Sequence, residues 1–379
     1  MTKKPETVKE EDLIKRKDGL YYVKDAKVAF TGISEEFFEN GQLQGRGNYK
    51  NGLAEGLHEV FDEYGELRGK GNYKNGKEHG LWEDFDENGQ LSERVNYKNG
   101  QQEGLKESFD DNDQVWERGY YKNGEREGLK ERLNDNGQVW LRENYNKGKQ
   151  DGPSEWFHEN GQLRGRDNYN KGKQEGPSET YHDNGQLSGR DNYKKGKLDG
   201  PSEHYHENGQ LHFKLNYKNG QREGLYEVFH KNGQLSYRGN YKNGKEEGLH
   251  EQFHDNDQLH SRQNYKNGQR EGLHESFYDN GQLQFKLNYK NGKKDGLWEY
   301  FDKEGNLTKT EEWKDGELYS SENYKNGQRE GLYETFQYNG QLLTKGKHKN
   351  GKKHGLWEYF DEEGNLTKSE TWEKEKLVE

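Results

Sequence analysis

Residues 56–79 read GLHEVFDEYGELRGKGNYKNGKEH, and variants of this stretch recur along nearly the whole chain at intervals of 24 residues. Each copy begins with Gly-Leu-x-Glu or a close variant, and a weaker copy begins at Gly32. Repetition at a fixed period of this length is typical of repeat proteins, so it decides the fold. The regular starts are Gly56, Gly80, Gly104, Gly128, Gly152, Gly176, Gly200, Gly224, Gly248, Gly272, Gly296, Gly331 and Gly355.

One interval is longer than the others: Gly331 follows Gly296 by 35 residues, which is 24 plus 11. Within a unit, two turn motifs such as Tyr64-Gly65 and Asn75-Gly76 are also separated by 11 residues. The long interval therefore indicates an inserted half-repeat of one strand and one turn near residues 308–320, with its turn at Asp315-Gly316.

Asn-Gly between short alternating runs is a strong signal for a β-hairpin. A three-residue loop, 63–65, would pair Phe61 with Leu67 and Glu59 with Gly69, with Gly65 at positive φ. For the second turn we expect three or five residues around Asn75-Gly76.

These registers predict one apolar and one polar face. The apolar face would carry a Leu row from Leu43 to Leu366, an aromatic row from Tyr49 to Trp372, and the Leu57, Glu59 and Phe61 positions. The opposite, solvated face would carry His58, Asp84, Lys106, Ser108, Lys130 and Arg132.

The predicted fold is all-β: an elongated, twisted and coiled antiparallel β-meander solenoid of tandem 24-residue hairpins. We expect a charged, disordered segment at residues 1–17 and a degenerate capping hairpin at 18–31. The repeat array would span 32–372, and residues 373–379 would form a polar end.

Composition excludes several classes of function. Only 26% of residues are hydrophobic and 35% are charged, yet 13% are aromatic. This combination indicates many short secondary-structure elements, each of which contributes one or two large aromatic side chains to the core. The absence of cysteine excludes disulfides and thiolate sites. A net charge of −11 disfavours nucleic acid and anionic membranes as partners. The sequence shows no signal peptide and no apolar run of transmembrane length, so we expect a cytoplasmic protein.

The stretches Asn-Gly-Gln-Leu and Asn-Tyr-Lys-Asn-Gly-Lys-x-x-Gly-Leu-x-Glu-x-Phe resemble the bacterial MORN-repeat-variant family, whose members are often labelled YwqK-like antitoxins. The resemblance covers about residues 19–372 and recurs in every unit. It implies antiparallel β-hairpin repeats and a role in protein interaction. It supplies no catalytic residues.

Two columns of side chains invite a binding hypothesis. A glutamate recurs in every unit, from Glu35 to Glu358. It could form a row of cation ligands, but a structural role is favoured, as an acceptor for Tyr hydroxyls or turn N–H groups. Five consecutive units also place a histidine at one position. Adjacent units lie about 9.6 Å apart, too far for two imidazoles to share a metal, so no metal or cofactor is expected. The histidines are His158, His182, His206, His230 and His254.

One block of the array differs from the rest, because three consecutive units read Gly-Pro-Ser-Glu. Tandem duplication of one variant unit explains the block, and so does a patch specific to a partner. The candidate patch consists of Pro153, Ser154, His158, Pro177, Ser178, His182, Pro201, Ser202 and His206.

The favoured function is a non-catalytic scaffold that binds a protein partner of unknown identity. The alternatives are an antitoxin or immunity protein, and lipid or glycan binding through exposed Tyr and Trp. No phosphate loop or catalytic constellation is present, and near-identical units would offer no unique pocket, which argues against an enzyme. Self-association is left open.

Overall fold

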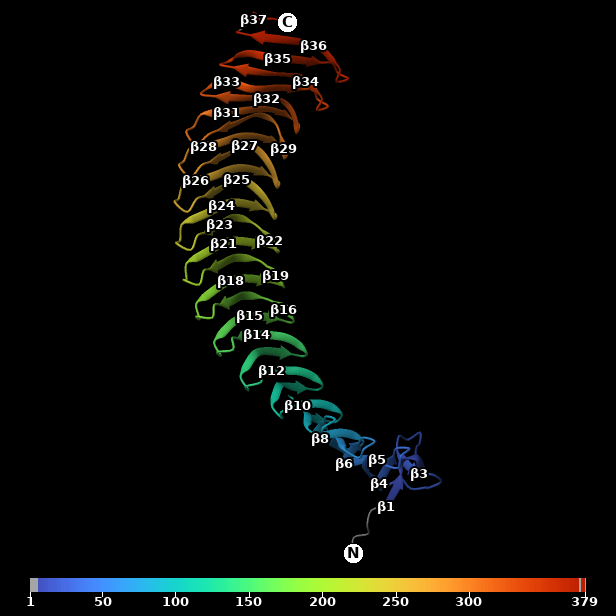
Figure 1. Cartoon of the computed structure of the whole chain (residues 1–379). Helices are drawn as coiled ribbons and strands as arrows, with labels where there is room; N and C mark the ends of the chain where they lie inside the picture. Colours follow the sequence, from blue (N-terminus) through green and yellow to red (C-terminus); the bar gives the residue numbers. More distant parts are fainter. Residues whose placement is uncertain (1–5, 375, 379) are drawn as a thin grey trace. The chain divides into compact units, whose positions relative to one another are not determined.

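The computed structural model describes residues 6–374 and 376–378. It is an antiparallel β-meander of tandem hairpins, as the sequence predicts, and it divides into two compact units. The first comprises residues 1–185 with 193–196, and the second residues 186–192 with 197–379. In both units each long strand pairs with its neighbours in sequence (Figure 1).

The first unit contains a short 3₁₀ helix, η1 (Glu10–Asp12), and seventeen strands. These are β1 (Glu6–Lys9), β2 (Leu13–Lys15), β3 (Tyr21–Val23), β4 (Gly32–Phe37), β5 (Leu43–Lys50), β6 (Leu53–Phe61), β7 (Leu67–Lys74), β8 (Lys77–Phe85), β9 (Leu91–Lys98), β10 (Gln101–Phe109), β11 (Val115–Lys122), β12 (Glu125–Leu133), β13 (Val139–Asn146), β14 (Lys149–Phe157), β15 (Leu163–Asn170), β16 (Lys173–Gln174) and β17 (Gly176–Tyr181).

The second unit continues the same alternation of strands, beginning with most of β18. Its strands are β18 (Leu187–Lys194), β19 (Lys197–Leu198), β20 (Gly200–Tyr205), β21 (Leu211–Lys218), β22 (Gln221–Arg222), β23 (Gly224–Phe229), β24 (Leu235–Lys242), β25 (Lys245–Phe253), β26 (Leu259–Lys266), β27 (Gln269–Phe277), β28 (Leu283–Lys290), β29 (Lys293–Lys294), β30 (Gly296–Phe301), β31 (Leu307–Lys314), β32 (Glu317–Lys325), β33 (Gln328–Phe336), β34 (Leu342–Lys349), β35 (Lys352–Phe360), β36 (Leu366–Glu373) and β37 (Lys376–Leu377).

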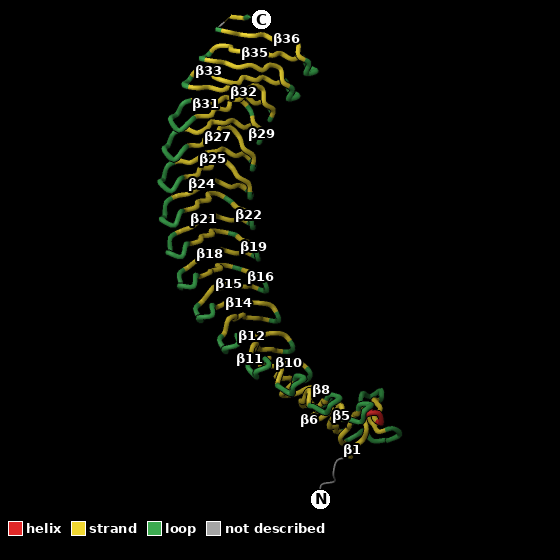
Figure 2. The backbone as a smooth tube through the Cα atoms, in the orientation of Figure 1, coloured by secondary structure: helices red, strands yellow, loops and turns green. Residues whose placement is uncertain are grey.

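Each repeat has two kinds of turn, which lie at opposite ends of the strands (Figure 2). The first is the predicted three-residue loop 63–65, closed by the Asp62 N–H donating to the Glu66 carbonyl, with Gly65 at φ 86°. The second has only two residues, Asn75 and Gly76, at φ 52° and 77°. Two positive φ values define a type I′ turn, so the prediction of three or five residues was wrong.

The predicted pairing of Phe61 with Leu67 is confirmed, but the predicted pairing of Glu59 with Gly69 is wrong. A bulge between Val60 and Phe61 shifts the strands, so Glu59 pairs with Lys70 and not with Gly69. A second bulge lies in the pairing of β5 with β6, where Gly47 faces His58 but Tyr49 faces Ala54.

The second bulge explains the glycine that begins every copy of the motif. On β6 it leaves residues 55–57 opposite the single Asn48 of β5. Gly56 lies within it at φ 89°, a left-handed conformation that disfavours residues with a Cβ atom. The Asn48 side chain donates to the Leu57 carbonyl at 2.6 Å, and the His58 ring Nε2 donates to the Asn48 carbonyl at 3.0 Å.

The bulges overturn the predicted division of the two faces. His58 lies on the same face as Gly71 and Tyr73, since it pairs with Gly71 and its ring centroid lies 4.4 Å from that of Tyr73. We call this the aromatic face. The Leu57 and Glu59 positions lie on the other face, which we call the charged face. Lys130, predicted to be solvated, is on the aromatic face and only 5% exposed.

The N-terminal segment is ordered where the structure describes it. β1 pairs in parallel with β4, and β2 with β3 forms a small separate sheet. Disorder was expected for residues 1–17, and the structure places residues 6–15 of this segment in β1, η1 and β2, whereas residues 1–5 lie outside the described residues. The short hairpin covers 13–23 and not 18–31. Phe30 is 3% exposed and packs against the Tyr49 ring, with 5.8 Å between the ring centroids.

In the second unit, β32 is the strand that accompanies the long interval in the sequence. It follows β31 through the turn at Asp315-Gly316 and pairs with both β31 and β33. An odd added strand reverses the chain direction of the strands after it relative to a regular array.

Candidate binding surfaces

The charged face carries a ladder of ion pairs along the glutamate column. Glu83 lies 3.0 Å from the Lys70 ammonium and 3.3 Å from Arg94 Nε on the strand at its other side. Lys70 and Arg94 hold the pKa of the Glu83 carboxyl below its usual value, although burial opposes them. Equivalent pairs recur in both units, so the column is structural, with Lys and Arg as its main partners. The predicted Tyr hydroxyl donors occur at Tyr181 and Tyr205.

A row of apolar side chains lies beside this ladder, one per repeat, at the position of Leu57. We call these side chains the apolar row. In the first unit Leu57 and Leu81 are each 40% exposed. In the second unit four leucines are 42–53% exposed: Leu225, Leu249, Leu297 and Leu356. A single exposed leucine is ordinary, but recurrence at one position makes a regular surface feature.

The Pro-Ser-His block divides between the two faces of the sheet. Pro153, Pro177 and Pro201 are exposed members of the apolar row. The serines that follow them point to the aromatic face, where Ser154 is 6% and Ser202 2% exposed. These serines occupy the repeat position of His58 and Lys130, which was predicted to lie on the solvated face, and the bulges reverse that assignment. Ser178 is half-buried.

Breaks in the strands do not follow the prolines strictly. β14 runs unbroken through Pro153, but β16 and β17 are separate before Pro177, and β19 and β20 are separate before Pro201. The same break separates β22 from β23 before Leu225. Asn144 donates to the Pro153 carbonyl at 2.8 Å, in the same way that Asn48 donates to Leu57. Pro153 and Pro177 belong to the first unit and Pro201 to the second.

The histidine column connects successive repeats. His158 Nε2 lies 3.4 Å from the Tyr181 carbonyl, and His206 Nε2 lies 3.1 Å from that of Phe229. In the described part of the chain, no three His, Cys, Asp or Glu side chains are grouped to hold a metal ion. His182 has contacts of its own.

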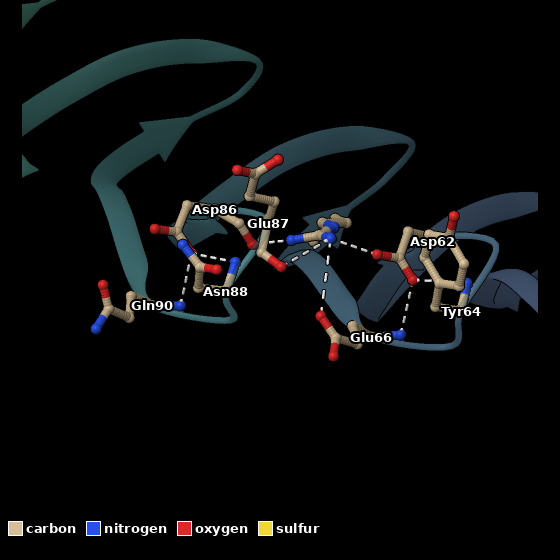
Figure 3. Close-up of polar contacts among 8 residues, drawn as sticks. Asp62, Tyr64, Glu66, Asp86, Glu87, Asn88 and Gln90 are labelled. Carbon is tan, nitrogen blue, oxygen red and sulfur yellow. Dashed lines mark hydrogen bonds and ion pairs between the residues drawn. The ribbon is translucent and has the colours of Figure 1, made fainter. Parts of the chain in front are cut away.

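In other repeats an aspartate occupies the histidine position and organises the turn (Figure 3). Asp62 accepts from the Tyr64 and Glu66 N–H groups, each at 2.9 Å. Arg68 then joins Asp62 to the carbonyls of Asp86 and Glu87 in the next turn. The column is therefore an inter-repeat contact in both forms.

The aromatic face of the first unit contains a buried cluster of charges. The Lys130 ammonium lies 3.3 Å from carboxylate oxygens of both Glu117 and Glu143. Arg132 donates to Glu117 at 2.9 Å. Burial opposes ionisation, but Arg132 and Lys130 lower the pKa of Glu117, so the carboxylate stays charged.

The aromatic face of the second unit contains a hollow of about 450 Å³ across β24–β28. Rings occupy one repeat position at Phe213, Tyr237 and Phe285, but Ser261 stands there in the repeat between the last two. The absent ring leaves the space. The argument that near-identical units offer no unique pocket was therefore wrong, because residues on this face differ between repeats.

Several polar residues line this hollow. Gln263 is 6% exposed, and its Oε1 has no hydrogen-bond partner among the described residues. The same is true of His274 Nδ1. Burial, with a smaller effect of the Arg270 cation, lowers the pKa of His274 to about 4. The sequence signal for this site was Ser261, which stands between Tyr237 and Phe285 in a row of rings, together with the polar Gln263 between Gly239 and Leu287.

Twelve segments of the chain match one family model, described as MORN repeat variant. The strands continue through the unmatched stretches near residues 124–149 and 316–352. No helix in the described residues is long and apolar enough to cross a membrane. The matches cover residues 30–51, 54–75, 78–99, 102–123, 150–171, 174–195, 198–219, 222–243, 246–267, 270–291, 294–315 and 353–374.

No curated protein matches the chain. Similar solved structures include "Crystal Structure of TcdB2-TccC3-TEV", at 12% identity and TM-score 0.17, covering 94% of this chain and 26% of that one. Another is "Crystal Structure of TcdB2-TccC3", at 11% identity and TM-score 0.16, covering 90% and 20%. This chain thus spans about a quarter or less of those chains, and likeness at such TM-scores supports no conclusion about it.

Proposed function

This chain belongs to the MORN repeat variant family, and we propose that it is a non-catalytic scaffold that binds a protein partner along its charged face. The observation that carries the proposal is the apolar row. Leu, or Pro in one block, recurs there in successive repeats, and in most of them the residue is exposed. A regular series of exposed apolar residues is typical of a surface that contacts a partner.

The ion-pair ladder beside the row favours a protein partner over a lipid surface. The charged face alternates Glu with Lys or Arg, so it offers complementary contacts to a mixed-charge protein surface. Equally spaced anchors in each unit also favour several weak contacts with an extended partner. The exposed Pro153, Pro177 and Pro201 would give one block of the row its own specificity.

Binding by a row variant tests this proposal. Partners captured from the native host by the full chain would be identified and their affinity measured with purified proteins. We expect Leu225→Lys/Leu249→Lys/Leu297→Lys to weaken binding at least about tenfold, a change of about 1.4 kcal/mol. The matched control makes the same charge change at three other exposed sites: Val28→Lys/Tyr64→Lys/Tyr338→Lys.

Equal affinity in the row and control variants would contradict the proposal. A single toxic partner bound one to one would instead favour the antitoxin function. Circular dichroism of both variants would verify that each retains its sheet.

A further inference from the structure

The hollow on the aromatic face is unexplained by partner binding along the charged face, because it opens on the other side of the sheet. We propose that it is a binding site for a neutral saccharide of one or two rings. Its volume of about 450 Å³ falls within the range of about 300–1,000 Å³ that is typical of small-ligand pockets.

The first argument is the pair of unpartnered polar atoms. Gln263 donates through Nε2 to the Asn264 carbonyl at 2.8 Å, which leaves Oε1 as a buried acceptor without a partner in the wall of the hollow. His274 Nδ1 is also buried and unpartnered among the described residues. Buried polar atoms without partners are costly, and water or a ligand normally satisfies them. A hydroxyl can donate to Gln263 and can either donate to or accept from His274.

The second argument is the protonation state of the lining. His250 Nε2 lies 2.9 Å from the Asn240 carbonyl, so it carries the proton, and Nδ1 accepts from the Tyr237 hydroxyl. Burial lowers the pKa values of His250, His260 and His274, so the three rings are neutral at pH 7. Three imidazoles in the lining therefore add no positive charge that would select an anion.

The third argument is the balance of the remaining lining groups. One cation, Arg270, and one anion, Glu246, line the hollow. Arg270 is already engaged with the Tyr289 hydroxyl at 3.0 Å, which reduces its capacity to hold a free anion. Amide and hydroxyl groups of Gln252 and Ser276 supply further hydrogen bonds.

Aromatic side chains complete the requirements for a sugar. Tyr237, Tyr265 and Phe285 supply ring surface to the hollow. A sugar presents C–H groups on its faces and hydroxyls at its edge, so it can contact these rings and the polar groups together. This differs from glycan binding through exposed Tyr and Trp, because the site is a recess formed by an absent ring.

The test uses the full chain and saturation-transfer difference NMR. The neutral probes are glucose, galactose, N-acetylglucosamine, maltose and cellobiose. Glucuronate and adenosine are the charged and flat heteroaromatic probes. We expect at least one neutral sugar to bind with Kd on the order of 1 mM or tighter, and glucuronate and adenosine to bind more weakly.

Two variants and one control locate the binding. Ser261→Phe inserts the ring found at Phe213 and Phe285, and Gln263→Leu inserts the residue found at Leu215 and Leu287. Both residues are already accommodated at these repeat positions, so we expect folding to be preserved. Each variant should weaken binding at least about tenfold, whereas Gln282→Leu, at an exposed turn outside the hollow, should not.

Three outcomes would overturn the proposal. The first is no saturation transfer to any neutral sugar. The second is a preference for adenosine or glucuronate over every neutral sugar. The third is binding that survives Ser261→Phe. None of these results would affect partner binding through the apolar row, so the two proposals fail independently.

Discussion

Two stretches of the first unit fill the same repeat positions of the aromatic face in opposite ways. Around Gly71 the face is closed by rings: Trp82 lies directly over the glycine, and the His58 and Tyr73 rings are 4.4 Å apart. Around Gly119 and Glu143 the corresponding positions hold Lys130 and its carboxylate partners.

The difference shows that the repeat specifies backbone geometry more strictly than it specifies the chemistry of its core. The bulge, its positive-φ glycine and the two turns recur in both stretches. The side chains that cover the face change in pairs across neighbouring strands. Where one strand has a glycine, the next strand packs a large ring over it, as Trp82 does over Gly71. Where one strand has a carboxylate, the next strand has a lysine that pairs with it, as Lys130 does with Glu143.

The largest effect should come from breaking the charged stretch. Replacing Lys130 with Met leaves Glu143, whose side chain is only 15% exposed, with its contacts to Gln150 and Tyr145 alone. Removing one partner of a buried ion pair costs about 3–5 kcal/mol, so the midpoint of urea unfolding should fall markedly. The control, Lys122→Met at an exposed strand end, should change little.

Hydrogen exchange would show where the loss occurs, with reduced protection centred on β11–β13. If Lys130→Met retained full stability, this result would contradict the conclusion that the ion pairs stabilise the charged stretch.

The next largest effect on stability should come from replacing one glycine with alanine in each stretch, which adds one methyl group. A Cβ on Gly71 would lie 2.1 Å from the Trp82 ring, whereas on Gly119 its nearest neighbour would be the Lys130 side chain at 3.6 Å. Overpacking costs about 1–3 kcal/mol, so Gly71→Ala should lower the unfolding midpoint. Gly119→Ala should be neutral or stabilise by up to about 1 kcal/mol, because it restricts the unfolded chain. Equal effects of the two changes would contradict the ring-over-glycine packing.

The repeat, the hairpins and the three-residue turn were predictable, because period, Gly placement and Asn-Gly signals are local. The faces were not, because they depend on bulges. A single shift between Val60 and Phe61 moves Glu59 from Gly69 to Lys70, and period-two reasoning then assigns the preceding residues of β6, such as Leu57 and Glu59, to the wrong face. The signal was the motif glycine, which a regular strand does not require.

The candidate site was harder to predict than the fold. Pro153, Pro177 and Pro201 stand out in the sequence because they change a motif, and the structure places them on the surface. The hollow depends on Ser261 being smaller than Tyr237 and Phe285, a relation across three strands that becomes visible only when the register is known.

Lowering the pH should destabilise the strands around the histidine-lined hollow more than those of the charged stretch. The folded-state pKa of His274, about 4, lies below the usual value of 6.5. The unfolded chain therefore binds the proton more readily, and stability is lost as pH falls from about 6.5 towards about 4. Residues 80–157 contain no histidine, so β11–β13 should keep their stability until carboxylates titrate.

Hydrogen exchange at pH 7.5 and pH 5.5, corrected for intrinsic rates, would compare β26–β28 with β11–β13. We expect protection to fall in the first set only, and His274→Phe to reduce that fall. Equal losses in both sets would contradict the assignment to buried histidine.

The smallest effect on stability is expected on the charged face, which is alike in both stretches. Changing Pro153, Pro177 and Pro201 together to Leu restores three backbone N–H groups, so thermal stability should rise slightly, by no more than about 0.5 kcal/mol per site. The Asn side chains that bind the proline carbonyls also bind leucine carbonyls, so the turns need not change. If the block has its own specificity, affinity for the native partner should nevertheless fall. Unchanged affinity in this variant, measured with the purified partner, would leave duplication of one variant unit as the explanation for the prolines.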